Sequence, residues 1–316
     1  MPRKNDLAER VLRGDHAAAS RALSLVVDEL PEAEALSKVF FAKSGTVQKI
    51  GVCGPPGAGK STLTARLVSY FRKKGLKVGI LAVDPSSPLT GGAFLGDRLR
   101  IQEHALDAGV FIRSLASRGM IGGVSHTIFG AIHVLEAAGF NKIIIETVGT
   151  GQDEVEIFRV ADTIMYVTTP HMGDDIQAMK AGVMEIGDCF IVNKADLAGK
   201  DKAISDLRSA LSLGRGHKPK PWETPVAGTS ALAGEGIEEL GKILDDHWDY
   251  LARSGEGRRR LKAQHREELS LYISRRVYRS ALSRISEKYL EDMVEHRTDP
   301  ASLGRRILRN DSSRSN

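Results

Sequence analysis

The stretch of sequence that decides the fold reads Lys49-Ile-Gly-Val-Cys-Gly-Pro-Pro-Gly-Ala-Gly-Lys-Ser61. Its apolar residues 50–53 predict a buried strand, and residues 62 to about 73 predict a helix. Between them, Gly54 is followed by Gly-Lys-Ser at 59–61, which is the spacing of a P-loop. A glycine-rich turn that binds nothing is the alternative, but strand, loop and helix follow one another as the motif requires. We therefore predict that this stretch binds a nucleoside triphosphate.

The chemistry expected of this loop follows from its backbone. Glycines let successive N–H groups point inward around a phosphate, and the N-terminus of the following helix adds a partial positive charge. The Lys60 side chain can reach the β- and γ-phosphates, and the Ser61 hydroxyl can hold Mg²⁺. The predicted phosphate-binding residues are Gly57, Ala58, Gly59, Lys60, Ser61 and Thr62.

Two further predicted strands end in an acidic residue. In the predicted strand 77–84, residues 78–83 are apolar and lead to Asp84. Residues 142–146 place three isoleucines before Glu146, as in a central parallel strand. A carboxylate at the carboxyl end of such a strand faces the ligand crevice of an open α/β sheet. Because Mg²⁺ prefers oxygen ligands, we predict that both acids support it. For Asp84, a helix cap or turn former is the alternative.

Gly149 follows Glu146 by three residues, where P-loop GTPases carry Asp-x-x-Gly. In that motif the glycine N–H meets the γ-phosphate. Since glutamate is longer than aspartate by one methylene, direct and water-bridged contacts with Mg²⁺ both remain open for Glu146. Gln152 follows closely enough to orient a water molecule. The predicted catalytic residues are Lys60, Asp84, Glu146 and Gln152.

A purine-selecting motif follows the predicted strand 188–193. It reads Asn193-Lys194-Ala195-Asp196, the Asn-Lys-x-Asp pattern of guanine sites. The carboxylate of Asp196 can accept hydrogen bonds from the guanine N1–H and 2-amino groups, whereas adenine would leave it unpaired. Asn193 and Lys194 are expected to brace the loop and cover the base, and the backbone of Ser230 and Ala231 to touch the guanine oxygen. We therefore predict GTP and GDP as ligands in preference to ATP.

These elements predict an α/β P-loop NTPase with a mostly parallel sheet flanked by helices. The expected parts are an N-terminal helical extension at 1–46, a nucleotide domain at 47–252 and a C-terminal helical arm at 253–316 with a disordered tail. We expect a linker at 254–257. An amphipathic arm beyond a finished domain has to bury its apolar face, so we expect it to form a homodimer; packing back on its own domain is the alternative.

The N-terminal extension shows helical periodicity over residues 5–42. Gly14 and Asp15 offer a turn and an N-cap between two helices, and Pro31 is expected to open a third. The sequence leaves open whether this prefix packs against the nucleotide domain or against a partner.

Charge and the distribution of apolar residues indicate which kinds of partner and compartment to expect. The net charge is +5, and residues 251–316 hold sixteen Lys and Arg against nine Asp and Glu. A basic tail can serve nucleic acid, acidic phospholipid or an acidic partner, but these aromatic residues form no stacking platform, and we favour a solvated helical face without nucleic-acid binding. No apolar run is long enough to cross a bilayer. Cys53 and Cys189 lie in apolar runs, as expected of buried thiols in a cytoplasmic protein.

The motifs together resemble the MeaB/ArgK-type G proteins, which accompany adenosylcobalamin-dependent methylmalonyl-CoA mutase. The most specific signals are Val-Asp-Pro-Ser-Ser-Pro at 83–88 and Glu-Thr-Val-Gly-Thr-Gly-Gln at 146–152. The other matching stretches are 54–61, 96–100, 117–123, 173–180 and 193–196. The resemblance covers nearly the whole chain.

The resemblance implies a homodimeric, slow GTPase that acts as a chaperone, gating cofactor loading of an acyl-CoA mutase and protecting that enzyme. It places Asp97 with Ser61, Asp84 and Glu146 in the magnesium and first switch region. Asp174 and Lys180 match a third switch that responds to the partner. There, His171-Met172 replaces the smaller residues usual in the family.

Two other kinds of enzyme share this architecture. A nickel-type maturation GTPase should carry a Cys/His ligand cluster, and the two cysteines lie too deep in their strands to serve. An ArgK-like kinase or transport-associated nucleotidase would need ATP, which Asp196 disfavours. A scaffold that binds GTP without hydrolysing it is a third possibility, and measured phosphate release would distinguish it.

Overall fold

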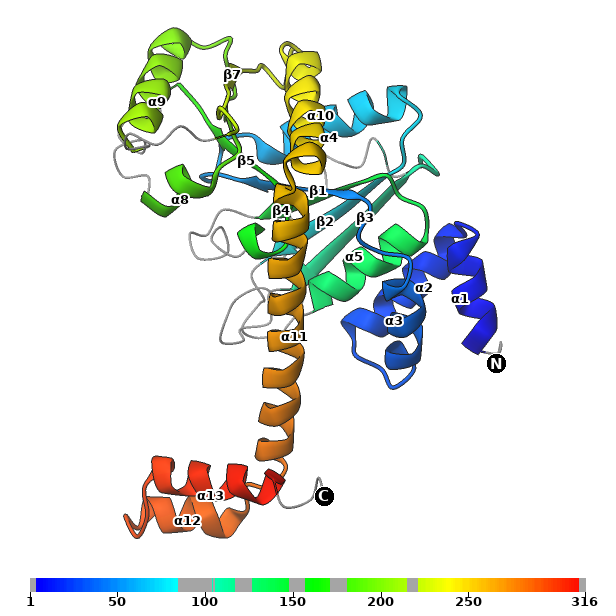
Figure 1. The fold of residues 1–316 in the computed structure, drawn as a ribbon, viewed down its shortest axis with the longest axis vertical. Coiled ribbons are helices and arrows are strands. Elements are labelled where there is room, and N and C mark those ends of the chain that lie inside the picture. Colours follow the sequence, from blue (N-terminus) through cyan, green and yellow to red (C-terminus); the bar gives the residue numbers. More distant parts are fainter. Residues whose placement is uncertain are drawn as a thin grey trace. The chain divides into compact units, whose positions relative to one another are not determined.

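The computed structural model describes residues 4–84, 104, 106–116, 127–147, 157–170, 181–214 and 221–312. Within these ranges, seven strands form one sheet in the order β3-β2-β4-β1-β5-β6-β7 (Figure 1). The strands are β1 Gln48–Cys53, β2 Val78–Asp84, β3 Val110–Ala116, β4 Lys142–Thr147, β5 Thr163–Thr168, β6 Cys189–Val192 and β7 Val226–Gly228. Every neighbouring pair is parallel, which confirms the predicted α/β class.

Helices of the nucleotide domain occupy both faces of the sheet. The bounds of all described helices are α1 Lys4–Leu12, α2 His16–Val27, α3 Ala33–Phe41, α4 Lys60–Lys73, α5 Thr127–Ala137, the short 3₁₀ helix η3 Ile157–Arg159, α8 Ala181–Ile186, α9 Lys200–Gly214, α10 Ile237–Ser254, α11 Glu256–Leu282, α12 Glu287–Val294 and α13 Pro300–Ser312. Helices α4 and α10 cover one face, where Ile50 and Val52 of β1 pack with Leu63, Leu67 and Leu240, all fully buried. Each such side chain stabilises the fold by roughly 1.5–3 kcal/mol.

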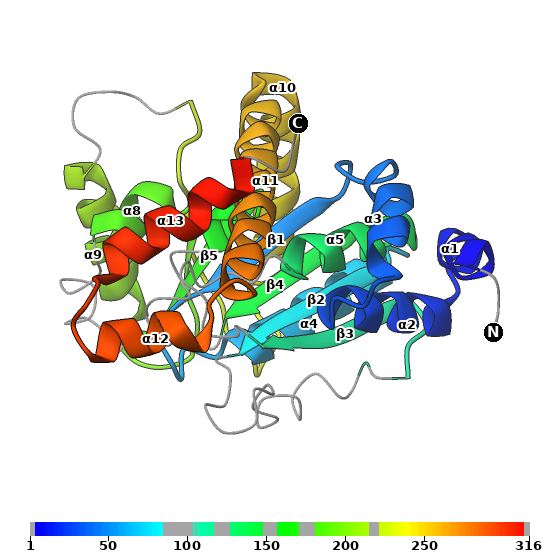
Figure 2. The same ribbon diagram turned by 90° about the horizontal axis from the view of Figure 1, so that it is seen from below.

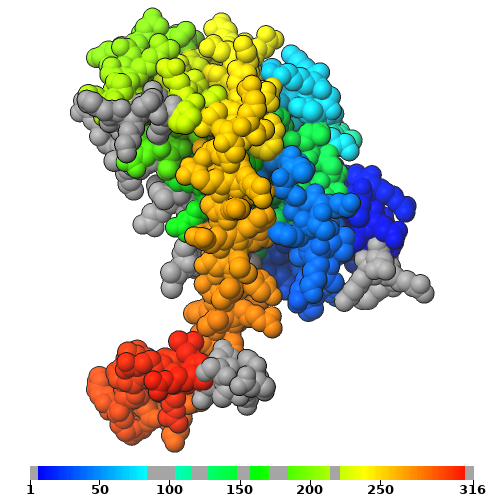
Figure 3. All heavy atoms as spheres, in the orientation of Figure 1, coloured from blue at the N-terminus to red at the C-terminus, as the bar shows by residue number. Residues whose placement is uncertain are grey.

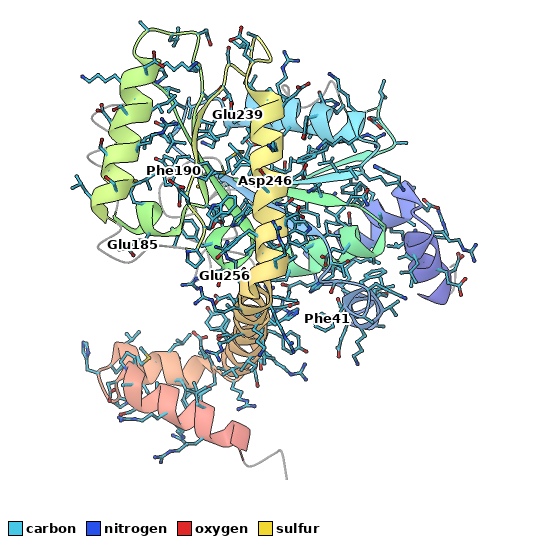
Figure 4. The ribbon with its side chains drawn as sticks, turned by 45° about the horizontal axis from the view of Figure 1, so that its top comes forward. Phe41, Glu185, Phe190, Glu239, Asp246 and Glu256 are labelled. Atoms are coloured by element: carbon cyan, nitrogen blue, oxygen red, sulfur yellow. The ribbon has the colours of Figure 1, made fainter. Side chains whose placement is uncertain are left out.

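Helix α10 is amphipathic, and its position follows from that pattern. In the space-filling view it lies between α9 and α4 (Figure 3). Its apolar side, with Leu240 and Leu244, belongs to the core, while Glu239 and Asp246 lie on its outer side (Figure 4). Phe190 of β6, also labelled there, is fully buried inside the domain.

The N-terminal extension packs on the opposite side of the molecule, against α5 of the nucleotide domain (Figure 2). As predicted, Asp15 caps α2, and its carboxylate accepts a hydrogen bond from the Ala18 N–H at 3.0 Å. Phe40 of α3 is fully buried, and the neighbouring Phe41 is half exposed with its ring edge-on to His133 of α5. The sequence left open whether the N-terminal extension packs against the nucleotide domain or against a partner, and in the structure it packs against the nucleotide domain.

A buried ionic network ties the start of α11 to the amino-terminal edge of the sheet. The guanidinium of Arg260 makes two hydrogen bonds to the carboxylate of Asp188, at 2.7 and 2.8 Å. Burial alone would raise the pKa of Asp188, but hydrogen bonds from Arg260 and His247 hold that pKa below its usual value. Gln264 donates to Asp162, whose carboxylate also pairs with Lys49 at 2.9 Å.

This anchoring corrects one expectation about the boundary of the arm. The linker predicted at 254–257 is reduced to Gly255, because α10 continues to Ser254 and α11 begins at Glu256. Gly255 has a φ of 75°, a left-handed conformation that ends one helix and turns the chain into the next.

The chain divides into two compact units, residues 1–264 and 265–316. Within the second unit, Leu303 and Ile307 of α13 are buried, and Arg284 donates to the carbonyl of Ile307 at 3.1 Å. Its exposed large apolar residues are Leu269, Tyr272, Ile273, Val277, Tyr278, Leu282, Ile285, Leu290, Val294 and Leu308. None of the helices in the described ranges combines the length and the apolar character that a membrane crossing requires.

Candidate functional site

The carboxyl ends of the strands meet at one edge, where β1 lies between β4 and β5. The connection after β1 runs to β2 on one side of the sheet, whereas the connection after its neighbour β5 runs to β6 on the other side. This makes the point between them a topological switch, where α/β proteins bind ligands. The loop from Gly54 to Gly59 follows β1, and α4 begins directly at Lys60. The Lys60 ammonium donates to the carbonyl oxygens of Gly54 and Pro55, at 2.6 and 3.1 Å. The lysine is thus held over the loop that is predicted to bind phosphate.

Ser61 and Glu146 meet beside this loop. Glu146 lies near the end of β4 opposite Val52 of β1, and the Ser61 hydroxyl donates to its carboxylate at 2.5 Å. Both side chains are more than nine-tenths buried. Hydroxyl and carboxylate oxygens are the hard ligands that Mg²⁺ selects, so this pair fits the cation. Within the described ranges, no group of three or more His, Cys, Asp or Glu is placed to hold a metal ion.

Asn193 connects the phosphate loop with the predicted guanine loop. It follows β6, is buried, and donates through Nδ2 to the carbonyl of Ala58 at 2.9 Å. Its Oδ1 accepts from the Thr229 hydroxyl at 3.2 Å and from the Ala231 N–H at 3.1 Å. Three segments far apart in sequence are therefore held together by a single amide side chain.

Asp196 follows three residues after Asn193 and is exposed. The Ser230 hydroxyl donates to its Oδ1 at 2.6 Å, and this hydrogen bond is the main reason why the pKa of Asp196 is lowered. The carboxylate is consequently ionised at neutral pH and acts as a hydrogen-bond acceptor. The preceding Lys194 has a φ of 56°, which turns the chain sharply between Asn193 and Asp196.

Asn193 and Asp196 line a cavity of about 550 Å³. Its lining comes from the phosphate loop, α4 and the loops after β6 and β7, and comprises Gly57, Gly59, Thr62, Ala65, Arg66, Asn193, Lys194, Asp196, Ser230, Ala231 and Leu232. This size and mixed lining suit a ligand of nucleotide size. Most residues predicted to bind phosphate and base therefore lie around one cavity.

Other predicted site residues fall outside the described part of the chain. Asp97, Gly149, Gln152, Asp174 and Lys180 belong to this group. For Asp84 only the backbone is described, as the last residue of β2.

Four residues that the sequence did not single out also belong to the site. Thr229 donates to Asn193, and Ala65, Arg66 and Leu232 line the cavity. Arg66 stands four residues after Thr62 on α4, and this spacing places both on one face of a helix. That spacing was the available signal for Arg66.

The two cysteines lie away from the cavity. Cys53 and Cys189 are free and buried, on strands separated by β5. Burial raises the pKa of the Cys189 thiol well above its usual value. The prediction of buried, unpaired thiols is confirmed.

Comparison of the chain with known sequences finds one family. The model of the family described as methylmalonyl Co-A mutase-associated GTPase MeaB matches residues 19–286. A putative GTPase of Pyrococcus abyssi is 40% identical over 310 residues, 96% of this chain and 96% of that protein. The GTPase ArgK of Escherichia coli is 37% identical over 253 residues, 78% of this chain and 76% of ArgK. The mitochondrial methylmalonic aciduria type A homolog of Caenorhabditis elegans is 31% identical, covering 83% and 70%.

Comparison with solved structures finds chains with a similar fold. A protein described as an LAO/AO transport system kinase superposes with a TM-score of 0.72 at 27% identity, covering 98% of this chain and 97% of that one. Nickel-bound HypB of Helicobacter pylori reaches a TM-score of 0.50 at 16% identity, covering 72% and 96%. At that identity the second likeness concerns the fold alone.

Proposed function

Because the chain belongs to the MeaB family of methylmalonyl-CoA mutase-associated GTPases, we propose that it hydrolyses GTP slowly and thereby assists an adenosylcobalamin-dependent acyl-CoA mutase. The assistance consists of gating the loading of the cofactor and protecting the mutase from inactivation. The observation that carries the nucleotide part is the ionised Asp196, held by Ser230 in the cavity that the phosphate loop also lines.

The proposed binding roles follow from donor chemistry. N–H groups of the loop at 57–59 and the start of α4 surround the β-phosphate, with the Lys60 ammonium beside it. Ser61 and Glu146 hold Mg²⁺, with Asp84 and Asp97 assigned to the same region. Bound Mg²⁺ supplies positive charge next to the phosphates. Asn193 fixes the loop that carries Asp196, and Asp196 accepts from the guanine N1–H and 2-amino groups.

In the proposed reaction the protein forms no covalent intermediate with the nucleotide. Transfer of the γ-phosphoryl group to water needs positioning and charge neutralisation, which loop amides and Lys60 provide. Gln152 orients the attacking water, and the Gly149 N–H meets the γ-phosphate. In this proposal the basal turnover is low and rises when the mutase orders the third switch, which includes Asp174 and Lys180.

A homodimer completes the proposal. The apolar side chains exposed on the second unit, such as Leu269, Ile273 and Leu282, need a partner surface to leave water. A second copy of the arm at 253–316 offers the same face.

Calorimetry with the full chain tests the nucleotide part. GDP is expected to bind far more tightly than ADP, and Asp196→Asn to shift the preference from guanine to xanthine, because an amide can donate to the xanthine O2 where the carboxylate only accepts. Equal affinity for GDP and ADP would contradict the guanine site. Phosphate release in the presence of Mg²⁺ separates a hydrolase from a scaffold that only binds GTP.

Capture from native extract with a slowly hydrolysed GTP analogue tests the partner. Recovery of a cobalamin-dependent mutase supports the proposal, whereas recovery of a nickel enzyme favours the maturation GTPase. Transfer of phosphate to a small acceptor instead of water would favour a kinase.

A further inference from the structure

We infer that Arg66 of α4 is a specificity-determining positioning residue, which fixes the direction of the peptide groups at 231–232 so that the pocket accepts a 6-oxo purine and rejects a 6-amino purine. This inference rests on the proposed guanine site, and it assigns the selection at purine position 6 to a group other than Asp196.

Arg66 makes two hydrogen bonds to the loop at 230–235, which we call the base loop. Its Nε donates to the carbonyl of Ala231 at 2.8 Å, and its Nη2 donates to the carbonyl of Leu232 at 3.1 Å. Two bonds from one planar guanidinium to successive carbonyls fix both their positions and their directions. Arg66 itself is half-buried and lines the cavity together with Ala231 and Leu232.

The loop needs such a restraint because part of it lies in solvent. Leu232 is 78% exposed, and the turn is closed by backbone hydrogen bonds between Ser230 and Glu235 in both directions, at 3.1 Å. Between these closing residues, the carbonyls of Ala231 and Leu232 bond to the arginine. Arg66 thus connects the base loop to the helix that begins at the phosphate loop.

The direction of a peptide group decides which purine it can face. In a trans peptide the N–H and C=O point opposite ways, so a carbonyl whose oxygen accepts from Arg66 has its direction fixed together with that of the N–H in the same peptide group. Guanine has an acceptor at position 6, whereas adenine and 2,6-diaminopurine have a donor there. A carbonyl released from Arg66 can turn toward the cavity and accept from a 6-amino group. Holding the carbonyls of Ala231 and Leu232 therefore excludes 6-amino purines.

Three diphosphates separate this role from that of Asp196. Inosine diphosphate keeps the 6-oxo group and lacks only the 2-amino group, so its deficit against GDP reports on Asp196. The 2,6-diaminopurine riboside diphosphate keeps the 2-amino group, carries a donor at position 6 and lacks the N1–H. Its deficit against GDP therefore includes one bond to Asp196, and only the change in that deficit between wild type and the Arg66 variants reports on position 6. Dissociation constants for all three are measured by calorimetry on the full chain, for wild type, Arg66→Ala and Arg66→Lys.

We expect Arg66→Ala to reduce the preference for GDP over the diaminopurine nucleotide by about tenfold, the scale of one net hydrogen bond. Its preference for GDP over inosine diphosphate should stay within about twofold of wild type. Arg66→Lys, with a single ammonium to share between two carbonyls, should fall between the two proteins.

The matched control is Arg72→Ala, on the same helix. Arg72 bonds to Asp107 at 2.8 and 2.9 Å and to the carbonyl of Leu76 at 2.9 Å, away from the base loop. Its loss should lower stability and leave both preferences unchanged.

Each other outcome overturns a particular statement. If Arg66→Ala keeps the wild-type preference at position 6, or loses both preferences equally, the positioning role is wrong and the guanine site stands. If the wild-type protein itself binds the three nucleotides equally, the proposed guanine site fails first. Should Arg66→Ala not fold, Arg66→Lys decides by the same ratios.

Discussion

Replacing Gly54 by alanine is expected to destabilise the protein far more than the same replacement at Gly57, three residues further along the phosphate loop. Gly54 has a φ of 134°, and a Cβ atom there would lie 2.0 Å from the carbonyl oxygen of Val167 and 3.0 Å from its carbonyl carbon. Val167 belongs to β5, which is hydrogen-bonded to β1 on one side and to β6 on the other, so its backbone cannot retreat. Gly57 has a φ of 77°, with no atom of the described residues within 4 Å of its Cβ position.

The magnitudes follow from these two geometries. A side chain at positive φ costs about 1–3 kcal/mol at either position. Overlap with an unyielding neighbour adds about 1–3 kcal/mol at Gly54 only. We therefore expect a loss of about 2–6 kcal/mol for Gly54→Ala and about 1–3 kcal/mol for Gly57→Ala, out of a total of roughly 5–15 kcal/mol for a folded domain.

Urea unfolding followed by circular dichroism measures both losses on the full chain without nucleotide. A Gly54→Ala protein that fails to fold, beside a Gly57→Ala protein that folds, has the expected direction. Equal losses at the two positions would refute the reasoning, since they would mean that the approach of the loop to β5 contributes nothing.

Three further results are expected, from the ion pair of Arg260 and Asp188, from Ser61 and from the two buried cysteines. Arg260→Met should lower the free energy of unfolding by about 3 kcal/mol at pH 7, because it removes the guanidinium that makes two hydrogen bonds to the buried carboxylate of Asp188. Arg260 lowers the pKa of Asp188, whereas burial raises it, so acid below about pH 4 removes stability from the wild type and relieves the variant. Urea titrations should therefore show that the difference in unfolding free energy between the two proteins shrinks in acid. A difference that stays constant with pH would contradict the pairing of Arg260 with Asp188. Ser61→Ala should slow Mg²⁺-dependent phosphate release by about tenfold or more, and a wild-type response to added Mg²⁺ would remove Ser61 from the cation site. The thiols of Cys53 and Cys189 should react with a thiol reagent only in denaturant, and prompt labelling of the native protein would contradict their burial.

Much of the fold could be predicted from the sequence because its signals are local. An apolar strand followed by Gly-x-x-x-x-Gly-Lys-Ser and a helix leaves few arrangements other than a P-loop domain. Parallel strands end at a common edge, so Glu146 and Asn193, as residues at strand ends, could be assigned to one crevice before any coordinates were known. The cap at Asp15 and the buried cysteines followed from equally local patterns.

Tertiary structure decided the contacts between distant segments. Arg66 and Ala231 are 165 positions apart, and Asp188 and Arg260 are 72 apart, so neither pair leaves a local pattern in the sequence. The linker expected at 254–257 failed for the same reason: glycines on either side of Glu256 favour a break, yet the bonds of Arg260 and Gln264 to the sheet edge hold α11 as a helix from Glu256 onward. Local sequence thus determined which elements form and where the phosphate loop lies. Packing determined which side chains hold the base loop and the start of the arm, because burial and hydrogen bonding depend on what the rest of the chain brings alongside.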